Sequence, residues 1–288
     1  MNSGLKLDNI DSAKIKEIVE RSLKEDIGKG DITSSLLEGS DHVIKGKFIG
    51  KKAGVIAGLA VAKMVFDCLD NKIRFTNLFQ DGGRVERGSI IADICGSAYE
   101  LLAGERVALN FLQRMSGIAT LTSKFVEKIA GTETVILDTR KTVPGLRILD
   151  KWAVRLGGGE NHRFGLHDMV LIKENHIKLA GSISSAVNSI KKGLKEHKQN
   201  LEIEIEVKNH AELREALELG ANRILLDNMT IEEIRKAVSI TKGQIPLEVS
   251  GNVTLENVSS IAATGINYVS VGMLTHSVKA LDISFLLD

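Results

Sequence analysis

Short apolar runs alternate with helical segments through the second half of this 288-residue chain, and this alternation limits the possible folds most strongly. The apolar runs cover residues 134–137, 169–172, 201–207, 223–226, 246–249 and 267–271. Helical periodicity covers residues 182–196, 211–219, 231–239 and 255–263, and Thr230 with Glu233 predicts a capping box for the third of these helices. Apolar strands separated by helices indicate a parallel sheet covered by helices. We expect an α/β barrel of TIM-like type, open or closed, with a doubly wound sheet as the alternative.

The first part of the chain follows a different pattern and is expected to form a separate α+β unit. Residues 11–25 have helical periodicity, and Asp11 is placed to cap the start of that helix. Residues 42–97 contain short β-like runs that glycines interrupt. Residues 99–129 are predicted to be helical, in two pieces that divide near Ser116 and Gly117. We therefore expect a domain boundary near residue 115.

Charge and composition exclude several classes of protein. The 38 basic and 37 acidic residues balance, and aromatic residues make up only 4 %, so neither a polyanion-binding surface nor a stacking platform for nucleic acid is expected. Cys68 and Cys95 fit no metal or redox motif. No run approaches the 18 or so apolar residues of a membrane span, and the first residues do not form a secretory signal. We expect a cytoplasmic protein that binds neither nucleic acid nor membrane.

Polar residues follow each apolar run, where the carboxyl ends of parallel strands form the active face of an α/β barrel. These endings are Asp138 with Arg140 and Lys141, then Lys173, Glu206 with Lys208, Asp227, Ser250 and Gly272. Between Arg140 and Lys178 there are eight Lys or Arg and four Asp or Glu, although the whole chain has a net charge of only +1. Such a local excess of cations predicts a small ligand with several carboxylates or phosphates.

Individual endings allow more than one chemistry. The turns at Ser250 and Gly272 offer backbone amides to a phosphate. Glu206 and Asp227 are suited to ribose hydroxyls, to Mg²⁺ or to an oxocarbenium-like transition state. Glu206 also belongs to an alternating acidic face with Glu202 and Glu204, which is unusual in a buried strand and predicts a polar partner for at least one of the three. Lys173 has a second possible role as a Schiff-base nucleophile.

At these positions the chain strongly resembles the quinolinate phosphoribosyltransferase family, also called nicotinate-nucleotide pyrophosphorylases. The motifs that carry the resemblance are residues 23–34 (LKEDIGKGDITS), 104–110 (GERVALN), 138–145 (DTRKTVPG), 158–163 (GGENHR), 226–228 (LDN) and 250–251 (SG). The resemblance covers almost the whole chain. It implies an N-terminal α/β sandwich over residues 1–115, on which residues 276–288 could pack back, and an open α/β barrel over residues 116–275.

The resemblance also implies an activity. The family transfers the phosphoribosyl group of phosphoribosyl pyrophosphate to quinolinate and yields nicotinate mononucleotide, pyrophosphate and CO₂, as a step of de novo NAD biosynthesis. Mg²⁺ is required and no organic cofactor is expected. The implied assembly is a homodimer in which each subunit completes the active site of its partner, with further assembly into hexamers left open.

Site residues are carried over from the same motifs. The residues implied to bind quinolinate are Arg140, His162, Arg163 and Lys173, with Arg106 from the partner subunit. Lys141 and Lys173 would face phosphoribosyl pyrophosphate, whose 5′-phosphate Ser250, Gly251 and Gly272 would hold. Glu206 and Asp227 would bind ribose hydroxyls and Mg²⁺. The residues expected to be catalytic are Lys141, Lys173, Glu206 and Asp227.

Three other functions are alternatives. A related transferase could use nicotinate, although one carboxylate would not need so many cations. An aldolase could form a Schiff base at Lys173, and a non-catalytic anion-binding protein could use the same fold. Retention of Glu206 and Asp227 beside the cations argues against simple anion storage.

Overall fold

The computed structural model describes residues 11–288, which divide into two compact units. Unit 1 contains the chain up to Ser123 together with Thr142–Gly158 and Leu274–Asp288. Unit 2 contains Lys124–Lys141 and Gly159–Met273. None of the helices within residues 11–288 combines the length and the apolar character that a membrane span needs.

Unit 1 is built on an antiparallel sheet. Its strands follow the order β12 (Ile283–Leu287), β1 (Val43–Gly50), β5 (Ile90–Ser97) and β3 (Arg74–Asn77), so that the end of the chain pairs with its first strand. Four phenylalanines pack with ring centroids 5.0–6.2 Å apart and join the sheet to helix α3 (Leu59–Leu69): Phe48, Phe66, Phe75 and Phe285. Phe48 and Phe66 are fully buried in the core of the unit.

Shorter elements complete unit 1. Helix α1 (Ser12–Ile27) packs on α3, and the side chain of Asp11 caps α1 as the sequence predicts. Helix α2 (Ile32–Ser35) follows, and strands β2 (Gly54–Val55) and β4 (Arg84–Val85) form a small separate pair. Helix α5 (Arg147–Leu156) also belongs to this unit.

Helix α4 (Ala98–Lys128) is one continuous helix of 31 residues, so the predicted division near Ser116 and Gly117 is wrong. Glycine is present at 117 for packing rather than to break the helix. A Cβ atom there would collide with the carbonyl oxygen of Lys279, which belongs to the segment that leads into β12. The glycine lets the returning chain lie directly against the helix backbone.

Unit 2 contains a parallel sheet of six strands within the described residues. They are β6 (Val135–Leu137), β7 (Val170–Ile172), β8 (Ile203–Val207), β9 (Arg223–Asp227), β10 (Leu247–Ser250) and β11 (Tyr268–Ser270). The spatial order is β6-β11-β10-β9-β8-β7, and no pairing joins β6 to β7 within residues 11–288. Each strand from β8 to β11 lies beside its predecessor, as in a barrel and unlike a doubly wound sheet, whose order reverses. The expectation of an open α/β barrel is confirmed.

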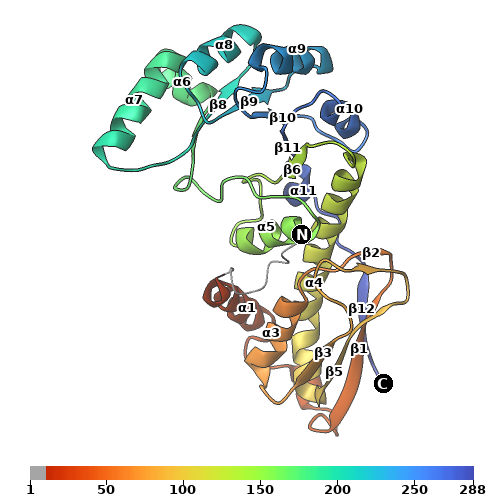
Figure 1. Cartoon of the computed structure of the whole chain (residues 1–288). Helices are drawn as coiled ribbons and strands as arrows, with labels where there is room; N and C mark the ends of the chain where they lie inside the picture. Colours follow the sequence, from red (N-terminus) through yellow and green to blue (C-terminus); the bar gives the residue numbers. More distant parts are fainter. Residues whose placement is uncertain (1–10) are drawn as a thin grey trace. The chain divides into compact units, whose positions relative to one another are not determined.

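Helices lie along the outer face of this sheet (Figure 1). They are α6 (Glu174–Ala180), α7 (Ile183–Glu196), α8 (His210–Glu218), α9 (Ile231–Thr241) and α10 (Val258–Ala262), and the short α11 (Met273–His276) follows β11. The predicted capping box of Thr230 and Glu233 is present at the start of α9. The helices bury one side of each strand, which leaves the opposite side to face the barrel interior.

Candidate active site

Strand register determines which side chains share the interior of the barrel, because paired residues of parallel strands point to the same face. Glu204 pairs with Arg223, and Asp227 pairs with Ser250. Ile203, Ile205 and Val207 alternate with the acidic residues of β8 and are buried. Glu206, Asp227 and Ser250 therefore face the interior near the carboxyl ends of their strands, at the position where barrel enzymes bind substrate.

Lys173 and Glu206 form an ion pair at this rim. Lys173 follows β7 as the N-cap of α6, and its Nζ lies 2.9 Å from Glu206 Oε2. The Glu206 side chain is 11 % exposed, whereas that of Lys173 is 47 % exposed. The prediction of a polar partner for the acidic face of β8 is thus confirmed. The pair holds a cation at the open side of the rim and a carboxylate beneath it.

Asp138, directly after β6, fixes the GGENHR motif beside that strand. Its carboxylate is fully buried and accepts hydrogen bonds from Asn161 Nδ2 at 2.6 Å and from the backbone N–H of His162 at 2.9 Å. Leu137 and Glu160 form a parallel bridge, in which the Asp138 N–H donates to the carbonyl of Glu160 at 3.1 Å. Arg140 and Lys141 follow Asp138 by two and three residues. They therefore extend from the same end of β6 to which the segment with His162 and Arg163 is bound.

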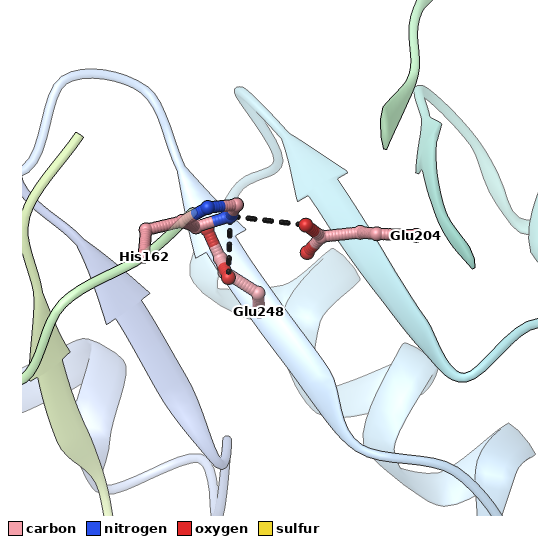
Figure 2. A group of neighbouring side chains, drawn as sticks. All are labelled: His162, Glu204 and Glu248. Atoms are coloured by element: carbon pink, nitrogen blue, oxygen red, sulfur yellow. Dashed lines mark ion pairs between the residues drawn. The ribbon is translucent and has the colours of Figure 1, made fainter. Parts of the chain in front are cut away.

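The imidazole of His162 points into the barrel interior, towards two carboxylates (Figure 2). Its Nε2 lies 3.0 Å from Glu204 Oε2 and 3.4 Å from Glu248 Oε2, and both carboxylates are fully buried. Burial alone lowers the pKa of His162, but Glu204 and Glu248 reverse this effect and raise the pKa from 6.5 to about 9. Nδ1 accepts the backbone N–H of Arg163 at 2.7 Å, so in this geometry the ring carries its proton on Nε2, which faces the two carboxylates, and a second proton on Nδ1 would break the contact with Arg163.

Arg223 of β9 carries a positive charge in this interior cluster. Its NH1 atom lies 3.0 Å from Glu248 Oε2, and its guanidinium stacks 4.2 Å from the centroid of the Tyr268 ring. Burial and the charge of Glu248 raise the pKa of Glu204, whereas His162 and Arg223 hold the pKa of Glu248 low despite its burial. The Arg223 guanidinium and the Nε2–H of His162 thus face two buried carboxylates.

Arg163 and Arg140 lie close enough for their charges to interact. Burial, and then the positive charge of Arg140, lower the pKa of Arg163. The NH1 atom of Arg163 donates to the carbonyl of Met169, just before β7, at 3.2 Å. Two guanidinium groups held near one another are stabilised by an anion between them, and a dicarboxylate supplies one charge for each.

The residues that follow β9 and β10 contact one another at a glycine turn. The Asn228 N–H donates to the Ser250 carbonyl at 2.9 Å, and Asn252 Nδ2 donates to Asn228 Oδ1 at 3.1 Å. Gly251 has a φ of +99°, and a Cβ atom there would collide with Asn228 Oδ1. Only glycine fits such a position without displacing Asn228, and a backbone amide in a glycine turn is a donor that suits a phosphate.

Glu206 and Asp227 are suited to Mg²⁺ by their chemistry. Both are carboxylates at the ends of neighbouring strands and face the same interior. Mg²⁺ prefers oxygen ligands and usually combines one or two carboxylates with substrate phosphates. The donor set therefore fits the ion that the sequence predicts.

The site residues predicted from sequence divide between the two units. Eight of those in unit 2 lie at or just after the ends of strands: Arg140, Lys141, Lys173, Glu206, Asp227, Ser250, Gly251 and Gly272. His162 and Arg163 also belong to unit 2 but lie in the segment between α5 and β7. Arg106 lies on α4 in unit 1, where its side chain is 59 % exposed.

Sequence reasoning missed the interior cluster of Glu204, Arg223 and Glu248. A signal was present, because Glu248 interrupts the otherwise apolar strand β10 between Leu247 and Val249. A buried charge in an apolar strand requires a partner. The pattern could not identify which residue that partner is.

Two family models together match nearly the whole chain. The model described as quinolinate phosphoribosyl transferase, N-terminal domain, matches residues 31–116. The model described as quinolinate phosphoribosyl transferase, C-terminal domain, matches residues 118–286.

Individual relatives give the same result. A Nicotiana glauca protein named quinolinate phosphoribosyltransferase (decarboxylating) 2, mitochondrial, is 43 % identical over 95 % of this chain and 82 % of its own. A Bacillus subtilis protein named probable nicotinate-nucleotide pyrophosphorylase (carboxylating) is 43 % identical over 94 % of this chain and 92 % of its own. The solved nicotinate-nucleotide pyrophosphorylase of Francisella tularensis superposes with a TM-score of 0.91 at 40 % identity, covering 98 % of this chain and 99 % of that one.

Proposed function

This chain belongs to the quinolinate phosphoribosyltransferase family, and we propose that the carboxyl ends of β6 to β11 form its active site. The enzyme transfers the phosphoribosyl group of phosphoribosyl pyrophosphate to quinolinate, with loss of CO₂, and produces nicotinate mononucleotide and pyrophosphate. It is a pentosyltransferase of de novo NAD biosynthesis, so the aldolase and anion-storage alternatives are not supported.

Arg140 and Arg163 bind the two carboxylates of quinolinate in this proposal, with Lys173 as a third cation and His162 behind them. The observation that supports the assignment is that the Arg163 guanidinium, held at the Met169 carbonyl, interacts unfavourably with the positive charge of Arg140, a repulsion that a dianion would relieve. Guanidinium groups also match carboxylates in geometry, because each can donate two parallel hydrogen bonds. A substrate with one carboxylate would leave one of these charges uncompensated.

Phosphoribosyl pyrophosphate occupies the adjacent part of the rim. Lys141 and Lys173 face its pyrophosphate, and the backbone amides of the turn at Ser250 and Gly251, together with Gly272, hold its 5′-phosphate. Glu206 and Asp227 hold the ribose hydroxyls and Mg²⁺, an ion that when bound neutralises charge on the pyrophosphate. The close approach at Gly251 and the donor chemistry of the two carboxylates support this placement.

The proposed chemistry requires positioning and charge balance rather than a covalent intermediate. The pyridine nitrogen attacks the anomeric carbon as pyrophosphate leaves, so positive charge develops on the ribose while negative charge collects on the leaving group. Carboxylates on one side and lysines on the other stabilise these two charges. The resulting pyridinium then stabilises the electron pair left at C2 when the adjacent carboxylate departs as CO₂.

We also propose a homodimer in which Arg106 reaches the active site of the partner subunit. Its exposed side chain on α4, 3.8 Å from Glu105, is placed on the surface of its own unit. For location we propose the cytoplasm, supported by the similarity to the bacterial protein, and cell fractionation would test it.

A paired assay tests the function. Purified protein is incubated with phosphoribosyl pyrophosphate, Mg²⁺ and either quinolinate or nicotinate, and nicotinate mononucleotide and CO₂ are measured. We expect product from quinolinate and little from nicotinate. Product mainly from nicotinate would overturn the substrate assignment.

Subunit mixing tests the shared site. Arg106→Ala and Lys173→Ala are each expected to be inactive, and mixed refolded subunits should recover part of the activity, because one site of each heterodimer carries neither change. Heterodimers that form but remain inactive would contradict a shared site.

A further inference from the structure

Residues 160–163 cross the gap between the two edge strands of the open sheet. On one side Glu160 is bound to β6, since its N–H donates to Ile136 at 2.8 Å and its carbonyl accepts from Asp138. On the other side Arg163 NH1 reaches the carbonyl of Met169, which immediately precedes β7. This crossing segment, residues 160–163, therefore occupies the position where a closed barrel would have further strands.

One side chain of the crossing segment ties it to the middle of the sheet. His162 contacts Glu204 on β8 and Glu248 on β10, two strands that are separated by β9 (Figure 2). The His162 side chain is only 7 % exposed. The segment is thus held at three places: β6, the start of β7, and the interior carboxylates.

The interior cluster is only partly compensated, because both carboxylate oxygens of Glu204 and Oε1 of Glu248 are buried without a hydrogen bond within the described residues. Its two fully buried carboxylates face Arg223 and His162, and a buried carboxylate without such partners would be strongly unfavourable. The donor atoms of His162, Glu204 and Glu248 lie within 4.8 Å of one another, a spacing that also suits a metal ion. Arg223, however, already supplies positive charge to Glu248, which argues for an anchor rather than a metal site.

The anchored ring also fixes the next residue. His162 Nδ1 accepts the backbone N–H of Arg163, so the two carboxylates on one side of the ring and the Arg163 backbone on the other are joined through a rigid group. We propose that Glu204 and Glu248 are positioning residues: through His162 they hold Arg163 beside Arg140, ready for the two carboxylates of quinolinate. This inference rests on the proposed role of the two arginines.

The test compares Glu204→Gln and Glu248→Gln with Glu218→Gln, which changes an exposed carboxylate at the end of α8. Glutamine keeps the shape of the side chain and removes its charge. We expect KM for quinolinate to rise on the order of 10-fold in the two interior variants, the loss of about one charge-assisted hydrogen bond. KM for phosphoribosyl pyrophosphate and the properties of Glu218→Gln should stay at the wild-type values.

Hydrogen–deuterium exchange provides a readout that is independent of turnover. Amides of residues 160–164 should exchange faster in both interior variants, while the strands of unit 1 keep wild-type protection. His162→Gln should show the same faster exchange at these amides. If the glutamate variants do not fold, exchange in His162→Gln is measured in their place. Wild-type KM for quinolinate together with wild-type exchange in the variants would overturn the inference.

The proposed function is checked separately by calorimetry of wild-type protein with quinolinate. If wild type binds quinolinate and the interior variants bind it equally well, only the positioning inference fails. If wild type does not bind quinolinate, the proposed function itself fails.

Discussion

Gly251 lies so close to Asn228 that the side-chain oxygen of Asn228 occupies the place where a Cβ atom of residue 251 would be. The contact joins the ends of β9 and β10, which Ser250 and Asn228 also connect through a backbone hydrogen bond.

Replacement of this glycine should therefore affect both folding and substrate binding. We expect Gly251→Ala to lower the free energy of unfolding by about 1–3 kcal/mol, since φ is +99° and the Asn228 side chain must move. KM for phosphoribosyl pyrophosphate should rise as well. Gly243→Ala is the matched control, because Gly243 also has positive φ but nothing within 4 Å of its Cβ position. Equal effects of the two changes in urea titrations and in KM would show that the contact with Asn228 has no consequence.

Arg140 should matter most for the substrate with two carboxylates. We expect Arg140→Ala to lower kcat/KM for quinolinate by about 10- to 100-fold, corresponding to a lost charged hydrogen bond of about 1.5–3 kcal/mol. Arg235→Ala, an exposed arginine on α9, should leave kcat/KM unchanged. Steady-state kinetics with quinolinate varied at saturating phosphoribosyl pyrophosphate provides the comparison, and near-wild-type activity would remove Arg140 from the site.

Asp150 should contribute strongly to the stability of unit 1. Its carboxylate is fully buried and receives two hydrogen bonds from Arg114, at 2.9 and 2.8 Å. Removal of one partner leaves a charge without compensation, so Asp150→Asn should lower the free energy of unfolding by about 3–5 kcal/mol. Asp67→Asn removes an exposed pair with Lys63 and should have a far smaller effect in the same denaturant titration. Similar losses of unfolding free energy in Asp150→Asn and Asp67→Asn would show that the buried pair contributes no more to stability than the exposed one.

Local patterns were sufficient to predict the barrel strands and the residues at their ends. The alternation of apolar runs and helices predicts β6 to β11, and the acidic face of β8 predicts a polar partner for at least one of its acids. The structure, not the pattern, identifies Lys173 as the partner of Glu206 and His162 as that of Glu204. These features depend on neighbours in the sequence, on which periodicity reports directly.

Features that depend on distant partners could not be predicted. Gly117 resembles a helix breaker in sequence, but Lys279 explains its presence inside a continuous helix. Glu248 is a lone acid in an apolar strand, and only the structure shows that His162 and Arg223 compensate it. Sequence spacing carries no information about which distant side chains meet in a barrel interior.

The strand order also affects when this protein can fold during its synthesis. Val135 of β6 pairs with Tyr268 of β11, and Phe48 of β1 pairs with Phe285 of β12. Each sheet therefore remains incomplete until the last part of the chain has left the ribosome, and its unpaired edges stay exposed until then. Residues 268–288 complete both units, so a nascent chain that stops before them would have neither sheet finished.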